Sequence, residues 1–558
     1  MISLYISNLI SVLIFLAYGK GINFFLLSKK ENTNNIILDI LSGAVYISFV
    51  ALIINFFYPL NTFVNNIILI FSLILFLFLV KKISILKSII HYTLIIGSIS
   101  FLIMVLDHTN RPDAGLYHLP YISILNDYKI IFGLSNIHFR FGHTSILQYT
   151  SAIFNNSIFL TKGITIPAAT VLVTLFIYFF KNLISIKKNY FFLFFYFLIS
   201  IFIILKTSRY NDIGNDAIGH LFLFLTIAIF LEKILKKDFN YENFFFLSLF
   251  SIFAFTNKVF LIFGFCFPLL YIIFSKKFNF LVNKKNIIFI FFILVFFIKN
   301  IVVSSCLIYP VKNTCFKSFS WSAVDKNVHS NPEVKSIEGE AAGKAWSDFK
   351  PKNLSFEQYK KNFVWFDTWK NKHLKYIFFK LLPIFIVILI LILILSKYES
   401  FNKKNSYKNL ERNFSKKVII TTIIISIVGS IYWFLKFPLF RYGYSYLVSL
   451  IVLFTSYYLS YFYTERNFLK VYKILFRLTV IALIFISFKN IQRIYENYEL
   501  KYVDYPWPKI YSFEQGNVKQ NNREILASNN FKIYYPSYRL CMYSQGPCTH
   551  YNEVKNEI

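Results

Sequence analysis

Long, continuous apolar runs separated by short polar segments dominate the chain. Most runs approach the ~20 apolar residues that a helix needs to cross the hydrocarbon core of a bilayer. They are unbroken stretches rich in Ile, Leu and Phe, without the alternation of a membrane β-barrel strand. The pattern predicts an all-α polytopic membrane protein with about 14 transmembrane helices. The runs lie near 4–27, 36–57, 62–80, 88–106, 163–180, 190–205, 218–231, 243–257, 259–274, 287–303, 376–396, 418–435, 444–463 and 474–488.

Lysine pairs mark one side of the predicted membrane domain. They follow alternate apolar runs, as at Lys29–Lys30, Lys81–Lys82 and Lys236–Lys237. Basic residues concentrate in the cytoplasmic loops of membrane proteins, so these loops are predicted to face the cytoplasm of a bacterial cell whose inner membrane holds the chain. The segments predicted to face the periplasm or the outside are 107–162, 206–217, 304–375, 436–443 and 490–558.

The composition agrees with this topology. The 558 residues are 56% hydrophobic and 20% aromatic, which excludes an ordinary soluble protein. The net charge of +32 would suit a nucleic-acid-binding protein, but the basic residues lie in the short loops between apolar runs. Membrane topology therefore accounts for the charge, and nucleic acid is not an expected partner.

Four of the five cysteines form two local pairs in predicted outward segments. Cys306 and Cys315 share one outer loop, and Cys541 and Cys548 share the C-terminal tail. Local pairs on the oxidising side of a membrane predict two disulfides. The alternative is a zinc site, for which the two pairs would have to meet in space. Cys266 lies within an apolar run and is predicted to be a packing residue.

The outward segment from Asp107 to His143 collects acids and histidines, which favours chemistry or binding of a charged ligand there. Asp113 precedes Tyr117 by four residues, and residues four apart share one face of a helix. An outward carboxylate can act as a general base toward an acceptor hydroxyl, or as a metal ligand. We predict that Asp113 is the catalytic base and that Tyr117 and His118 bind substrate. The alternative is a solvated acid that caps the next helix.

The segment GLSNIHFRFGH adds His138, Arg140 and His143 to the same loop. A guanidinium group with neighbouring imidazoles can bind a phosphate or a sugar hydroxyl, so these three residues are predicted to bind substrate. The alternative is an interfacial amphipathic helix whose basic groups touch lipid headgroups.

A second acidic loop carries Asp212 and Asp216, again four residues apart. Two outward carboxylates on one helical turn can hold a divalent cation, Mg²⁺ or Mn²⁺, that neutralises a phosphate leaving group. We therefore predict a metal site at these two residues. The alternative is that Asp216 caps the helix predicted over 218–231.

Lys258 and Arg441 are predicted on the outward side, against the charge trend of the other loops. Cations placed in this way are candidates for binding an anionic lipid phosphate, and Arg209 in the second acidic loop joins them. The alternative for each is snorkelling at a helix end. The sequence contains no P-loop, G-x-G-x-x-G, H-E-x-x-H or G-x-S-x-G motif, so a donor carried on a membrane lipid is expected rather than a free nucleotide.

This pattern resembles the GT-C superfamily of multi-pass glycosyltransferases, which use polyprenyl-phosphate sugars. Their first outer loop holds an acid in a D-x-x-x-Y-like context, and Asp113 with Tyr117 matches it. A second acid follows two helices later in that family, and Asp212 or Asp216 fits this place. The family's cations for the lipid phosphate would be carried here by Lys258 together with Arg441.

The resemblance covers roughly residues 88–450, and segments such as DAGLYHLP and SCLIYPVKNTCF are similar to bacterial membrane proteins of this type. Two features depart from the family. Three predicted helices precede the helix that is usually the first in that family, and no polar feature is expected inside them. In addition, Ala114 stands where many relatives have a second acidic residue.

The sequence divides into an N-terminal extension, a GT-C-like catalytic core with two outer loops, an extracytoplasmic loop, a C-terminal helical part and an outer tail. The resemblance implies transfer of a hexose or pentose from a polyprenyl-phosphate donor to a glycan, lipid or protein acceptor at the outer face. One alternative is a polysaccharide polymerase or ligase that relies on outward arginines. Another is a flippase or transporter, which would need ionisable groups at mid-membrane depth and internal repeats. The boundaries are 1–87, 88–303 with loops 107–162 and 206–217, 304–375, 376–489 and 490–558.

Overall fold

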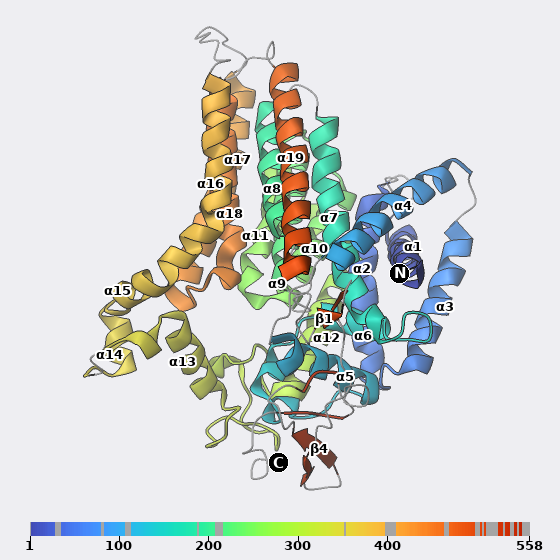
Figure 1. Ribbon diagram of the computed structural model, residues 1–558, viewed down its shortest axis with the longest axis vertical. Coiled ribbons are helices and arrows are strands. Elements are labelled where there is room, and N and C mark those ends of the chain that lie inside the picture. The colour runs from blue at the N-terminus through green and yellow to red at the C-terminus, as the bar shows by residue number, and fades with distance from the viewer. Residues whose placement is uncertain are drawn as a thin grey trace.

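The computed structural model of the chain is shown in Figure 1. It describes residues 2–27, 35–79, 83–106, 113–186, 189–206, 216–350, 353–396, 409–462, 468–496, 503–504, 507–508, 523–527, 531–535, 541–543 and 546–549.

Helices make up nearly all of the described secondary structure. The α-helices are α1 (Ile2–Leu26), α2 (Ile36–Asn55), α3 (Thr62–Leu79), α4 (Ile83–Leu106), α5 (Leu119–Asp127), α6 (Leu147–Ile153), α7 (Ile166–Ser185), α8 (Tyr190–Lys206), α9 (Asp216–Leu235), α10 (Tyr241–Asn257), α11 (Cys266–Ser275), α12 (Ile287–Ser304), α13 (Pro332–Gly343), α14 (Phe356–Lys361), α15 (Trp365–Trp369), α16 (Lys375–Leu395), α17 (Asn409–Lys436), α18 (Phe440–Phe462) and α19 (Phe468–Glu496). Shorter 3₁₀ or π turns are η1 (Ala114–His118), η2 (Leu134–Asn136), η3 (Phe139–His143), η4 (Thr161–Thr165), η6 (Val259–Phe265), η7 (Phe278–Phe280), η8 (Lys284–Asn286), η9 (Lys312–Thr314), η10 (Trp346–Asp348) and η11 (Lys370–Leu374).

Four short strands lie near the C-terminus and form two antiparallel pairs. They are β1 (Val503–Asp504) with β2 (Trp507–Pro508), and β3 (Arg523–Ala527) with β4 (Phe531–Tyr535). The pairing of β3 with β4 places Ile525 opposite Ile533. These strands are a small addition to an otherwise helical protein.

The prediction of an all-α membrane protein is confirmed. Within the described residues, nine helices are long and apolar enough to cross a membrane, and three further apolar helices are shorter. The total of about 14 spans, expected from one run per ~20 residues, is not confirmed. One reason lies at 259–274, where the apolar run forms the 3₁₀ turn η6 followed by the 10-residue helix α11 instead of one long helix.

The first two helices cross at very close range. A Cβ atom added to Gly19 or Gly43 would overlap the backbone of the facing helix, so glycine is required at both positions. Polar groups also meet here, contrary to the expectation for these helices. Asn23 donates from Nδ2 to Asp39 Oδ1 at 2.9 Å, and the hydroxyl of Tyr46 donates to Asn23 Oδ1 at 2.7 Å. The N-terminal helices therefore contain a buried hydrogen-bonded network.

The predicted outward segments gather at one end of the helical bundle. In Figure 1, α5, α13, α14 and β4 lie below the long helices α7, α8, α16 and α19. Hydrogen bonds join these segments. Asn136 Nδ2 donates to the carbonyl oxygen of Trp321 at 3.0 Å. The backbone N–H of Met542 donates to the carbonyl oxygen of Gly115 at 2.8 Å. The segment 304–375 and the C-terminal tail therefore both contact the loop that carries Asp113.

Both predicted disulfides are confirmed. Cys306 is bonded to Cys315, and Cys541 is bonded to Cys548. The pairs do not form a joint zinc site, because all four sulfurs are used in these bonds. Cys266 is a free, partly buried cysteine, in agreement with a packing role.

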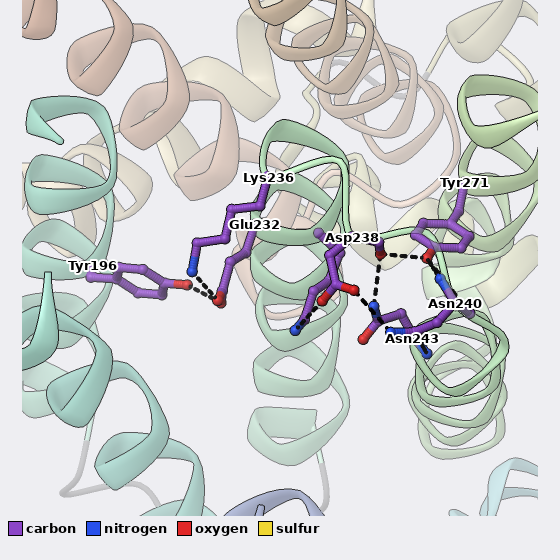
Figure 2. Close-up of polar contacts among 8 residues, drawn as sticks. Tyr196, Glu232, Lys236, Asp238, Asn240, Asn243 and Tyr271 are labelled. Carbon is purple, nitrogen blue, oxygen red and sulfur yellow. Dashed lines mark hydrogen bonds and ion pairs between the residues drawn. The ribbon is translucent and has the colours of Figure 1, made fainter. Parts of the chain in front are cut away.

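A polar network lies at the C-terminal end of α9. Figure 2 shows Glu232 accepting hydrogen bonds from the hydroxyl of Tyr196 at 3.1 Å and from Lys236 Nζ at 2.7 Å. The carbonyl oxygen of Asp238 accepts from the hydroxyl of Tyr271 at 2.9 Å. These bonds fix the turn between α9 and α10. Since α9 has 20 residues and rises ~1.5 Å per residue, the turn lies about 30 Å along the helix from Asp216.

Candidate functional site

Two ion pairs join residues that are far apart in the sequence. The guanidinium Nη1 of Arg441 lies 3.4 Å from Asp113 Oδ2, and the ammonium group of Lys258 lies 2.6 Å from Asp216 Oδ1. Lys258 is buried, with 6% of its side chain exposed, while the other three side chains are 41–47% exposed. The four charged groups come from the residue before η1, the start of α9, the end of α10 and the start of α18. The pairs therefore form where these elements converge at the outer-loop end of the bundle.

Tyr442 connects the two pairs. Its ring centroid lies 4.5 Å from Lys258 Nζ and 5.1 Å from Arg441 Cζ. Its hydroxyl also accepts a hydrogen bond from Arg441 Nη2 at 3.1 Å. A tyrosine face attracts cations, so Tyr442 holds the ammonium and guanidinium groups close together despite their like charge. Sequence reasoning missed this residue, although it directly follows Arg441.

A π turn carries Asp113 and its neighbours. Asp113 precedes η1, and Pro120 opens the helix α5 that continues from it. A π turn is a rare conformation that is often found at functional sites. The predicted proximity of Tyr117 to Asp113 is consistent with the electrostatics, because the charges of Asp113, Arg140 and Arg441 all act on the Tyr117 hydroxyl. Burial is the larger effect and raises the pKa of Tyr117 above its ordinary value, so the phenol is protonated.

Two tryptophans and a histidine fix the turn before Arg441. Trp433 Nε1 donates to the carbonyl oxygen of Leu439 at 2.7 Å, and Trp369 Nε1 donates to that of Pro438 at 2.8 Å. His220 Nε2 lies 2.9 Å from the carbonyl oxygen of Arg441. A carbonyl oxygen only accepts, so Nε2 carries a proton here. These contacts hold the first turn of α18 against α9 and against the segment 304–375.

His220 was missed as a positioning residue, although the sequence contained a signal for it. It follows Asp216 by four residues on α9, so the two side chains lie on the same face of that helix. His220 therefore links the helix that carries Asp216 to the turn that carries Arg441.

A chain of neutral polar groups runs behind the ion pairs. Gln148 Nε2 donates to His118 Nδ1 at 3.0 Å, because an amide NH₂ group only donates. Gln148 Oε1 accepts from the backbone N–H of Ser145 at 3.0 Å, and Ser145 Oγ donates to Asn257 Oδ1 at 2.5 Å. Asn257 precedes Lys258 in the sequence. The chain therefore connects the Asp113 loop to the end of α10 through residues that sequence reasoning missed.

Burial tunes two of the titratable groups at the site. It lowers the pKa of Lys258 to about 8, because loss of water disfavours the ammonium form; the charge of Asp216 acts in the opposite direction. Burial also lowers the pKa of His118 to about 4, which agrees with a neutral ring that accepts at Nδ1. The site therefore contains a lysine that titrates near neutral pH and a histidine that stays neutral.

The segment around η3 lies beside this centre and is not the amphipathic α-helix considered as an alternative. His138 is buried and accepts from the backbone N–H of Arg140 at 3.1 Å. The guanidinium of Arg140 lies 4.7 Å from the ring centroid of Tyr117. His143 is exposed, with its ring 5.2 Å from that of Tyr309. Two 3₁₀ turns, η2 and η3, thus place the predicted binding residues next to the Asp113 loop.

Two predicted site residues, Arg209 and Asp212, lie outside the described residues. Within the described part of the chain, no group of three or more His, Cys, Asp or Glu residues is placed to hold a metal ion. Asp113 and Asp216 are each paired with a cation, Arg441 and Lys258. The metal site at Asp212 and Asp216 stays a prediction, because Asp212 lies outside the described residues.

The family comparison covers most of the chain. The family model described as "Domain of unknown function (DUF8201)" matches residues 1–448. The chain belongs to this family. No curated protein and no solved structure matches it. The DUF8201 match begins before the predicted N-terminal helices and ends within α18, so it contains both ion pairs of the site. The C-terminal tail with the second disulfide lies beyond it.

Proposed function

We propose that the protein is a membrane glycosyltransferase that takes a sugar from a polyprenyl-phosphate donor and transfers it to an acceptor hydroxyl at the outer face. The observation that carries the proposal is the convergence of Arg441, Asp113, Lys258 and Asp216 at one end of the bundle. Two cations held by one aromatic ring suit a phosphate group, and a half-exposed carboxylate beside them suits a base.

Lys258 and Arg441 would bind the donor phosphate. During transfer, the bond between the anomeric carbon and the phosphate oxygen breaks, and the phosphodiester with one negative charge becomes a monoester with two. Cations that are already in place stabilise this added charge without reorganisation in the transition state. Tyr442 holds both cations near each other, so a single phosphate can contact both.

Asp113 would accept the proton of the acceptor hydroxyl as its oxygen attacks the anomeric carbon from the side opposite the phosphate, with inversion. Asp113 is paired with Arg441. A donor phosphate competes for that guanidinium and leaves the carboxylate available to the acceptor. Binding of the donor would thus prepare the base for the reaction. The proton gained by Asp113 and the charge gained by the phosphate balance the step.

The test is transfer from a polyprenyl-phosphate sugar by the purified protein with Asp113→Asn. A lost general base lowers the rate about 10²–10⁴-fold. Asp127→Asn is the matched control, because Asp127 lies in the same loop and accepts from the backbone N–H of Gly546, which an asparagine oxygen also can. Wild-type activity in the Asp113→Asn variant would exclude this base. If Arg140→Gln and Arg441→Gln then abolish activity, the polymerase or ligase alternative is favoured.

A further inference from the structure

The positive charge beside the two ion pairs is not balanced. Arg441 and Lys258 have Asp113 and Asp216 as partners, but Arg140 makes no ion pair within the described residues. Its guanidinium instead lies 4.7 Å from the ring centroid of Tyr117 and 5.4 Å from that of Phe139. Contact with aromatic rings orients the planar guanidinium while leaving its N–H donors available to a ligand.

Lys299 adds a buried amine without an acidic partner in the described part of the chain. It is 1% exposed, its Nζ donates to Thr144 Oγ1 at 3.1 Å, and it lies 4.7 Å from the ring centroid of Phe296. No carboxylate pairs with it among the described residues. Burial disfavours the charged form of such an amine, and an anion bound nearby would favour it. Since Thr144 follows His143, Lys299 acts on this segment from the protein interior.

His143 lies in the same 3₁₀ turn as Arg140 and directly precedes Thr144. Loss of hydration lowers the pKa of its imidazole, and the positive charges of Arg140, Arg441 and Lys299 lower it further. His143 is an exposed residue. Arg140 and His143 thus share the turn η3, and Lys299 contacts the residue that follows it.

We infer that Arg140 and His143, with Lys299 behind them, form a second oxyanion site that binds a carboxylate or phosphate group of the acceptor. Arg140 supplies a planar pair of donors for two oxygens, and His143 supplies an exposed ring nitrogen. The donor phosphate is assigned to Lys258 and Arg441, so this site takes a different anionic group. The assignment to the acceptor rests on the proposed function, whereas the anion site itself does not.

The test is calorimetric titration of the full-length protein in neutral phosphatidylcholine nanodiscs, without any glycosyl donor. The probes are inorganic phosphate and glucuronate, with glucose as the uncharged reference. Arg140→Gln is expected to weaken binding of at least one anion about tenfold or more, because a charge-assisted bidentate contact is lost. Lys299→Met should weaken it less, since Lys299 contacts this segment only through Thr144. Loss confined to glucuronate identifies a carboxylate ligand, and loss confined to phosphate identifies a phosphate ligand.

Lys335→Gln is the matched control. Lys335 also lies over the Phe139 ring, at 4.8 Å, but it has its own carboxylate partner in Glu338 at 2.6 Å. The control should bind both anions within about twofold of wild type, because its charge is already balanced. Equal losses in the Arg140→Gln and Lys335→Gln variants, or no loss in Arg140→Gln, would overturn the site. Because no donor is present, an inactive transferase that still binds anions through Arg140 would refute only the proposed reaction.

Discussion

The backbone N–H of Met542 donates a 2.8 Å hydrogen bond to the carbonyl oxygen of Gly115, within the π turn that follows Asp113. The tail makes further contacts with the same loop. The backbone N–H of Gly546 donates to Asp127 Oδ2 at 3.1 Å, and the hydroxyl of Tyr543 contacts Asn126 and Asn155. The disulfide between Cys541 and Cys548 encloses these residues, so the tail supports the loop of the candidate base.

Replacing Cys541 and Cys548 together by Ser is expected to loosen this contact. A disulfide that closes a short loop stabilises by about 2 kcal/mol, which corresponds to about 30-fold faster local opening when it is lost. Hydrogen exchange of the amides of residues 113–127 measures this. Cys266→Ser is the control and should leave exchange unchanged, because Cys266 is not in a disulfide. Unchanged exchange in the double variant would show that the tail does not stabilise the loop.

The pH dependence of transfer is expected to follow Lys258. Its pKa is lowered to about 8, so the ammonium loses its proton at a lower pH than an ordinary lysine. Activity should therefore fall as the pH rises through about 8, as the positive charge that binds the donor phosphate disappears. A pH profile of kcat/KM measures this fall.

Two variants check this assignment. Lys258→Arg keeps its charge at all accessible pH values and should retain activity above pH 8. Asp216→Asn removes the charge that supports the ammonium and should move the fall to lower pH. If the alkaline fall does not move in either variant, Lys258 is not the group that titrates.

The crossing of α1 and α2 depends on glycine. Gly43→Ala is expected to lower the free energy of unfolding by about 1–3 kcal/mol, because the new methyl group overlaps the backbone of Phe15. Gly21→Ala on the same helix pair is the control. Its Cβ would lie 3.3 Å from Leu75 Cδ2, a side-chain atom that can move. Thermal unfolding in detergent compares the stability of the two variants. Equal stability of Gly43→Ala and Gly21→Ala would contradict the close approach of α1 and α2.

Trp369, in the segment 304–375, is expected to position Arg441. Trp369→Phe removes the Nε1 donor to Pro438 and should raise the KM for the donor about fivefold, because a buried hydrogen bond contributes about 1 kcal/mol. Trp365→Phe is a close match, since Trp365 is also buried in α15 but its Nε1 has no hydrogen-bond partner in the described part of the chain. Steady-state kinetics with varied donor measures the difference. A similar donor KM in both variants would show that the hydrogen bond does not position Arg441.

The sequence alone determined the class of the protein and its local covalent links. Continuous apolar runs predict membrane-spanning helices, because the apolar composition of a segment of ~20 residues is enough for it to cross the hydrocarbon core. Cys306 with Cys315, and Cys541 with Cys548, lie close together along the chain, so their pairing was predictable. The choice of Asp113, with Tyr117 four residues on, also rests on local spacing.

Only the tertiary structure decided which distant groups meet. The contact of Arg441 with Asp113 joins residues 328 positions apart, and no local pattern encodes such a pairing. The same holds for Lys258 with Asp216, which sequence reasoning had assigned to separate roles in phosphate and metal binding. Helix packing brings the ends of α9, α10 and α18 to the π turn. The charged side chains then form ion pairs, because each side chain would otherwise lose part of its hydration without gaining a partner of opposite charge.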